Sequence, residues 1–217
     1  MAHLDLSHVI TPAMETYPGL PVPIIQDHIS RAEAEKIYGP GITFQIGLVT
    51  MCTNTGTYID VPFHRYADGH DLTELALERV AAVPAVCLRP ERPVGAIEIA
   101  AEQLAGLAGH GVLIHTGHAQ HWSTPAYFEN HPFLTEASAH ALVEARVACV
   151  GIDSLNIDST EGGDRPVHTV LLGNEVPIIE HLTNLDQLPT DAPFTFSAVP
   201  PKIAGAGTFT VRAYATI

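Results

Sequence analysis

Apolar residues fall into short runs along the chain, and polar residues, glycine and proline separate these runs. The runs have the length and the β-branched content that are typical of strands. They cover residues 44–53, 85–90, 111–117, 147–154, 169–173, 176–182 and 208–217. The 17 glycines and 17 prolines fit a chain that is divided into many short elements.

Two further segments have apolar residues at helical spacing and predict helices. Residues 97–109 end in glycine. Residues 135–146 begin with Thr135, a candidate N-cap, followed by Glu136, whose negative charge suits the first turn of a helix.

The order of these elements indicates the fold class. A helix, the strand at 111–117, a second helix and the strand at 147–154 form one α/β repeat, in which a parallel sheet is buried on both faces. The strands toward both ends of the chain are more typical of an antiparallel or barrel-like sheet. We therefore expect an α/β fold: a mixed sheet with a large β component and flanking helices.

Composition limits the size and the class of the protein. The 217 residues are 46% hydrophobic and 16% charged, which predicts one domain over residues 1–217. The net charge of −14, with only ten Lys and Arg, argues against binding nucleic acid or an anionic membrane.

The expected location is the cytoplasm. Cys52, Cys87 and Cys149 stand in apolar contexts, where buried and reduced thiols are expected. The N-terminus lacks a positive region followed by an apolar run, so we expect no signal peptide. No apolar stretch has the length of about 18 residues that a spanning helix needs.

Polar residues are dense between residues 53 and 71. Asp60 and His64 flank Pro62, which excludes the middle of an α-helix and predicts a strand that turns into a loop. Gly56 just before them permits a positive φ. Such a turn aims several polar side chains at one point, although a hydrogen-bonded turn without a site is the alternative.

Two other segments carry candidate chemistry. If the runs at 169–173 and 176–182 pair as a hairpin, His168 and Glu180 come side by side, within reach of one cation. An ordinary cross-strand hydrogen bond is the alternative there. Residues 115–132 follow a buried strand and suit either a substrate-facing loop or a packed surface loop.

Taken together, these segments resemble the cyclase family of metal-dependent hydrolases, which includes bacterial kynurenine formamidases and isatin hydrolase. The resemblance runs almost from end to end. It rests on DLSH at 5–8, YPG at 17–19, the motif from Gly56 to His64, HTG at 115–117, GIDSLNID at 151–158, His168 with EHLTNL at 180–185, and GAGTFTVRA at 205–213.

The central motif departs from the family signature His-x-Gly-Thr-His-x-Asp-x-Pro-x-His. Asn54 and Tyr58 stand where the signature has its first two histidines. The resemblance implies that Asp60 is a metal ligand and that His64 is the acid–base imidazole.

The resemblance also implies that His168 and Glu180 are the other protein ligands. With Asp60 they make two carboxylates and one imidazole, a harder set than zinc prefers. We expect one divalent metal ion, Mn or Zn, with Fe or Mg as further candidates. A metal-free site is the alternative, and so is a rescue of the missing ligands by His70, His115 or His118.

The expected function is the hydrolysis of a C–N bond in a small cyclic or aryl amide, or of a lactone, in an arylformamidase-like reaction. His64, Tyr58, Asn54 and Thr57 are the candidate catalytic residues. His64 would transfer the proton, and Thr57 with backbone N–H groups would hold the oxyanion. The aromatic residues expected to shape a pocket for a flat ring are Phe63, Tyr66, Trp122, Tyr127 and Phe128.

Two other functions are compatible with the same sequence features. Without a metal, Tyr58 and His64 could act as acid and base in a cyclase, isomerase or dehydratase working on a small carbonyl compound. The third reading is a non-catalytic family member that binds a small ligand.

Expected partners are a small-molecule substrate and further copies of the chain, but neither nucleic acid nor membrane. The resemblance implies a homodimer or a higher homo-oligomer in which a neighbouring chain closes the site. The apolar, proline-rich residues 11–25 could lie across such a partner or cover the chain's own core. Tyr17, Arg31 and Tyr38 could reach the site from this region.

Overall fold

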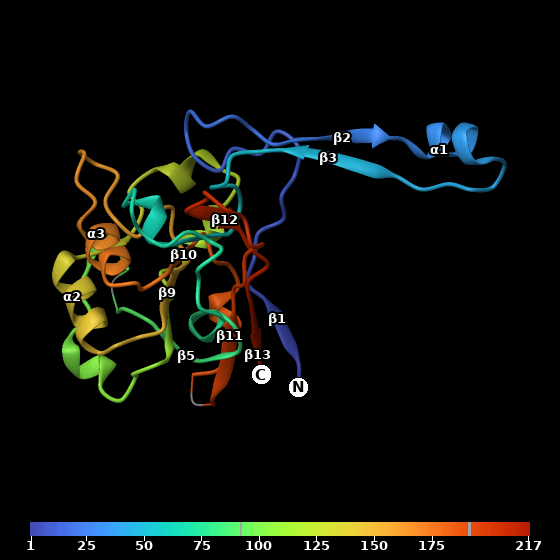
Figure 1. Ribbon diagram of the computed structural model, residues 1–217. Coiled ribbons are helices and arrows are strands. Elements are labelled where there is room, and N and C mark those ends of the chain that lie inside the picture. Colours follow the sequence, from blue (N-terminus) through green and yellow to red (C-terminus); the bar gives the residue numbers. More distant parts are fainter. Residues whose placement is uncertain (92, 191) are drawn as a thin grey trace.

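A computed structural model of the chain describes residues 1–91, 93–190 and 192–217. Within these residues, nine strands form one mixed sheet at the centre of the molecule (Figure 1). In order across the sheet they are β1 (His3–Asp5), β13 (Tyr214–Thr216), β11 (Phe194–Ser197), β5 (Val83–Leu88), β7 (Gly111–Ile114), β9 (Cys149–Ile152), β10 (Ile178–Glu180), β4 (Tyr58–Asp60) and β12 (Thr208–Thr210).

The middle of the sheet is parallel. Strands β5, β7, β9 and β10 run in one direction, and every residue of β7 and β9 is buried. Val112 and Ile114 pack into one apolar cluster while Leu113, between them, packs into the other. Alternate residues of a strand point to opposite faces, so the sheet is covered on both sides, as predicted.

The two ends of the sheet are antiparallel. Strands β11, β13 and β1 pair in this way at one edge, and β4 and β12 at the other. The α/β fold with a large β component is thereby confirmed. The single-domain organisation stays a prediction.

The α-helices are α1 (Arg31–Tyr38), α2 (Glu136–Glu144) and α3 (Pro166–Gly173). The prediction for α2 is confirmed with its cap, because the Thr135 side chain accepts a hydrogen bond from the backbone N–H of Ser138 at 3.2 Å. Helices α2 and α3 contribute to one apolar cluster on the sheet. No helix in the described part of the chain has the length and apolar composition that crossing a bilayer requires.

Two predictions of secondary structure are wrong. Residues 97–109 do not form a helix: Ala96–Ile97 is strand β6, paired with β8 (Phe133–Leu134), and only the short 3-10 helix η3 (Ala101–Leu104) follows. Residues 169–173 are not a strand but the end of α3. The apolar, β-branched composition of that run was outweighed by a helix start at Pro166.

The remaining short elements are 3-10 helices in the connections. Besides η3 they are η1 (Pro62–His64), η2 (Leu77–Arg79), η4 (His118–His121), η5 (Pro125–Phe128) and η6 (Leu185–Gln187).

A hairpin extends from the body of the molecule (Figure 1). It consists of β2 (Ile24–Ile29) and β3 (Ile46–Thr50) with α1 between them, and we call residues 24–50 the arm. Strand β3 confirms the prediction at 44–53, yet all five of its residues are exposed.

The loop before β12 packs against the turn that carries His64. The N–H of Val61 donates to the carbonyl of Gly207 at 2.9 Å. A Cβ atom on Gly207 would lie 2.2 Å from the backbone nitrogen of His64 and 2.6 Å from its Cα. Only glycine permits this approach of two backbones.

Replacing Gly207 by Ala should therefore disturb both stability and the turn at His64. We expect the free energy of unfolding to fall by about 1–3 kcal/mol or more, the usual effect of overpacking. The matched control is Gly163→Ala, where an added Cβ meets no atom within 4 Å. Urea unfolding of both variants measures the difference, and equal stabilities would contradict the described packing.

Candidate active site

Asp60 is the last residue of β4 and is fully buried. The chain then turns through η1, which begins at Pro62, so the predicted strand-to-loop transition is confirmed. One carboxylate oxygen of Asp60, Oδ1, accepts a hydrogen bond from the hydroxyl of Thr208 on β12. The other, Oδ2, is buried and has no hydrogen-bond partner among the described residues.

His64 lies beside Asp60 and is the more open of the two, with 37% of its side chain exposed. Its Nδ1 is 2.8 Å from Oγ1 of Thr208. Because the Thr208 hydroxyl gives its hydrogen to Asp60, it can only accept from His64. The neutral imidazole therefore carries its hydrogen on Nδ1 and a lone pair on Nε2.

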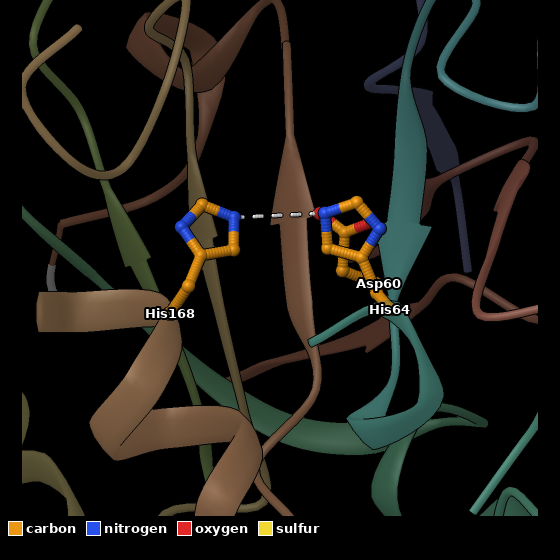
Figure 2. Close-up of side chains that lie close together, drawn as sticks. All are labelled: Asp60, His64 and His168. Carbon is orange, nitrogen blue, oxygen red and sulfur yellow. Dashed lines mark ion pairs between the residues drawn. The ribbon is translucent and has the colours of Figure 1, made fainter. Parts of the chain in front are cut away.

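His168 is held from behind by Asp158. The Asp158 carboxylate accepts the backbone N–H groups of Val167 at 2.8 Å and of His168 at 2.9 Å, at the start of α3. It also accepts from Nδ1 of the His168 ring at 2.7 Å. Nε2 is thereby directed at the centre of the site, 3.6 Å from Oδ2 of Asp60 (Figure 2).

Glu180 and Tyr58 are cross-strand neighbours on β10 and β4. The Tyr58 hydroxyl donates to Oε2 of Glu180 at 2.5 Å, and the N–H of Ile157 donates to Oε1 at 2.7 Å. Oε1 also lies 3.7 Å from Nε2 of His168. The predicted hairpin is wrong, but His168 and Glu180 do meet, because α3 returns the chain to the sheet.

The buried charges shift the protonation equilibria of this group. Burial by itself would lower the pKa of His168, but the Asp158 hydrogen bond and the carboxylates of Asp60 and Glu180 outweigh it and raise the pKa to about 10. Burial, together with the charge of Asp60, raises the pKa of Glu180 to about 7. Three carboxylates, those of Asp60, Asp158 and Glu180, surround the single imidazole of His168, so negative groups outnumber positive ones in this buried cluster.

Asp60, His64 and His168 form a group of the kind that binds metal ions, with one potential ligand atom of each residue within 4.8 Å of the others (Figure 2). No other such group was found among the described residues. It contains two of the three predicted metal ligands, Asp60 and His168. It includes His64 in place of Glu180, which instead accepts hydrogen bonds at the edge of the group.

The three histidines considered as replacement ligands lie outside this group. His70 pairs with Glu175 at 3.0 Å on the surface. His115 faces Asp153, and His118 is hydrogen-bonded through Nε2 to the backbone carbonyl of Tyr127 at 2.8 Å. The predicted rescue is therefore wrong.

Thr57 and Asn54 are placed differently from one another. The Thr57 hydroxyl is buried, donates to the carbonyl of His181 at 2.6 Å and accepts the N–H of His8 at 3.0 Å. Asn54 instead lines the cavity at the site, and its Oδ1 accepts from the Thr53 hydroxyl at 3.2 Å.

A cavity of about 310 Å³ opens onto the site. It is lined by Tyr17, Pro18, Leu20, Asn54, Tyr58, His64, Asn156, Arg165, His168 and Glu180. None of the five aromatic residues predicted to shape the pocket is among them: Trp122, for example, stacks on His8 with ring centroids 3.9 Å apart. Tyr17 does reach the site, from within the same chain.

Sequence reasoning missed Thr208, Asp158, Asn156 and Arg165 as members of the site. Asp158 and Asn156 fall within the segment 151–158 that carried part of the resemblance, but nothing in that segment indicates a bond to His168. Metal-binding histidines commonly donate their other ring N–H to a carboxylate, and that rule points to Asp158, ten residues before His168. Thr208 is 148 residues from Asp60, and no local signal connects the two.

Two comparisons with known sequences connect this chain to one family. Residues 4–159 match the model of the Cyclase family, described as "Putative cyclase". The kynurenine formamidase of Salinibacter ruber (strain DSM 13855 / M31) is 28% identical over 98% of this chain and 96% of its own length. That of Geobacillus thermodenitrificans (strain NG80-2) is 27% identical over 97% of this chain and 95% of its own.

Solved structures share the fold. An isatin hydrolase bound to the product analogue thioisatinate superposes with a TM-score of 0.80 at 21% identity, over 99% of this chain and 92% of that one. Isatin hydrolase A from Ralstonia solanacearum gives 0.79 at 24% identity, over 99% and 91%. With a family match over most of its length, and relatives that align almost from end to end, this chain belongs to the Cyclase family.

Proposed function

We propose that this protein is a metal-dependent hydrolase that cleaves the C–N bond of small cyclic or aryl amides, or a related lactone. The observation that carries the proposal is Oδ2 of Asp60, a buried carboxylate oxygen that has no hydrogen-bond partner among the described residues and lies 3.6 Å from Nε2 of His168. Such an atom is costly to bury unless a cation faces it. The relatives named kynurenine formamidase support amide hydrolysis as the reaction class.

The residues present fit one divalent cation. Oδ2 of Asp60 and Nε2 of His168 face each other across 3.6 Å, and both His64 and Glu180 adjoin them. Asp158 supports His168 in the way that a second carboxylate supports a metal-bound imidazole. Carboxylate and imidazole donors accommodate manganese, iron, magnesium or zinc.

Binding of the cation competes with a proton. With its pKa near 10, His168 is protonated at neutral pH when the cation is absent, and Nε2 must release that proton to act as a ligand. The affinity for the cation therefore rises with pH.

Chemistry at the site divides between the cation and this chain's own groups. When bound, the cation supplies the Lewis acidity that polarises a carbonyl and makes water more acidic. His64 takes a proton from the attacking water on Nε2 and returns it to the leaving nitrogen. Its Nδ1–H is held by Thr208, whose hydroxyl is held in turn by Asp60, so the ring stays oriented while it is charged.

Asn54 is the proposed donor to the oxyanion. Its amide oxygen accepts from Thr53, which leaves the amide N–H groups for a ligand in the cavity. The hydroxyls of Thr57 and Tyr58 already donate to His181 and Glu180. The role predicted for Thr57 as an oxyanion donor therefore requires that its present hydrogen bond be broken.

The arm supports assembly into a homodimer. Its exposed apolar side chains include Ile24, Ile25, Leu48 and Val49, on a ribbon that projects from the body (Figure 1). Ile25 and Val49 pair on one face of the ribbon, and Ile24 and Leu48 lie on the other. Exposed apolar side chains gathered in one segment are typical of a protein–protein contact. We propose that a second copy of the chain covers it.

The metal site predicts a stoichiometry. We expect about one divalent ion per chain by elemental analysis, lost in Asp60→Ala and in His168→Ala because both remove proposed ligands. Asp158→Asn should weaken the affinity by about 10–100-fold. His70→Ala is the control and should keep the ion. Wild-type protein that stays free of metal after incubation with manganese and zinc would refute the proposal.

The role of His64 predicts a loss of rate. With formanilide as a test aryl formamide, His64→Gln should lower kcat/KM by about 10²–10⁴-fold, the usual contribution of a general base. Metal content must be measured on the same sample: loss of the ion would identify His64 as a ligand rather than a base. A rate within a few-fold of wild type would contradict both roles.

Substitutions in the arm should change the oligomeric state of the protein. By light scattering, wild-type protein should have twice the 23.2 kDa mass of the chain, and Ile25→Glu with Val49→Glu should give the single-chain mass. Leu77→Glu, at an exposed apolar residue outside the arm, is the control and should leave the dimer intact. A dimer that persists in the double variant would place the interface elsewhere.

A further inference from the structure

One guanidinium group lines the cavity at the site. Arg165 lines it together with Tyr17 and Asn156, and no other Lys or Arg does so among the described residues. We propose that Arg165 and Tyr17 form a subsite for a carboxylate carried by the substrate, beside the carbonyl that is cleaved. This inference rests on the proposed function and specifies its substrate class as anionic.

Arg165 is anchored at one end and open at the other. It stands just before α3, and its Nη1 donates to the carbonyls of Asp164 at 2.7 Å and Gly162 at 3.3 Å, in its own loop. In the part of the chain that the structure describes, no carboxylate lies within ion-pair distance of it. Its Nε and Nη2 groups therefore remain for a ligand, and together they present the edge that binds a carboxylate with two parallel hydrogen bonds.

Tyr17 is the second donor of the subsite. It lines the same cavity as Asn156, whose Oδ1 atom accepts the N–H of Asp158 at 2.9 Å. Burial raises the pKa of Tyr17 far above neutrality, so the hydroxyl keeps its hydrogen.

Charge pairing gives the subsite its selectivity. Arg165 and Tyr17 are half-buried, so a neutral substrate leaves the guanidinium group in contact with water. A carboxylate at the same place accepts hydrogen bonds from both Arg165 and Tyr17, and hydrogen bonds to a charged group are stronger than those between neutral groups.

Two aryl formamides that differ only in a carboxylate test this inference: N-formylanthranilate and formanilide. Arg165→Gln should lower kcat/KM for N-formylanthranilate by about 10–100-fold, the effect of losing a charge-assisted pair. For formanilide it should stay within about threefold, because no partner is lost. Arg165→Lys should give an intermediate loss, because it keeps the positive charge but not the pair of parallel N–H donors.

Arg65→Gln is the matched control. Arg65 contacts Thr169 of α3, the helix that follows Arg165, but lies outside the cavity, so this substitution should leave the rates on both substrates unaffected. Tyr17→Phe should lower the rate only for the carboxylate-bearing substrate. An equal loss on both substrates in Arg165→Gln, or no loss on either, would overturn the inference.

Failure of the proposed function gives a different result, namely no hydrolysis of either formamide by wild-type protein. The subsite is then tested by calorimetric titration with benzoate and with its neutral isostere benzamide. Benzoate that binds more tightly than benzamide, and at least about tenfold more weakly to Arg165→Gln, supports the subsite. Equal binding of benzoate by wild type and variant, or no binding by wild type, overturns it.

Discussion

The Asp158 carboxylate holds together the part of the structure that matters most for chemistry. It accepts two backbone N–H groups at the start of α3 and the Nδ1 hydrogen of His168. The first two bonds begin a helix in a segment whose composition favours a strand, and the third sets the direction of the imidazole. Without this one buried acceptor, both the helix start and the ring would lose their orientation, because unpaired N–H groups at a buried helix end are costly.

The sequence predicted the features that local chemistry decides. Strands β7 and β9, the Thr135 cap and the turn after Asp60 follow from side-chain pattern, hydrogen-bonding type and the constraint of Pro62. The strand predicted at 169–173 is wrong because the acceptor that starts the helix there, Asp158, lies on another segment. The helix predicted at 97–109 is wrong because its apolar spacing also fits an extended chain, in which the N–H of Ile99 donates to the Ser138 hydroxyl.

The acidic and histidine side chains of the candidate site could be predicted from the sequence. The residues that hold these side chains in place by hydrogen bonds could not. Asp60, His64, His168 and Glu180 do converge, and that much followed from the resemblance. Tyr58 shows what the altered motif does: its hydroxyl satisfies a Glu180 oxygen across the β4–β10 pair. Such a bond depends on strand register, which two segments more than a hundred residues apart determine only when they pair.

The place of β12 in the sheet has a consequence for how the protein is made. Thr208, which connects Asp60 to His64, lies on this strand, and Gly207 packs beneath the His64 turn. On the ribosome, Asp60 and His64 emerge nearly 150 residues before the segment that organises them. Until then the Thr208 hydroxyl cannot link the carboxylate to the imidazole, so a nascent chain that ends before Thr208 has an incomplete site. The site is thereby completed only after residues 207 and 208 have been synthesised.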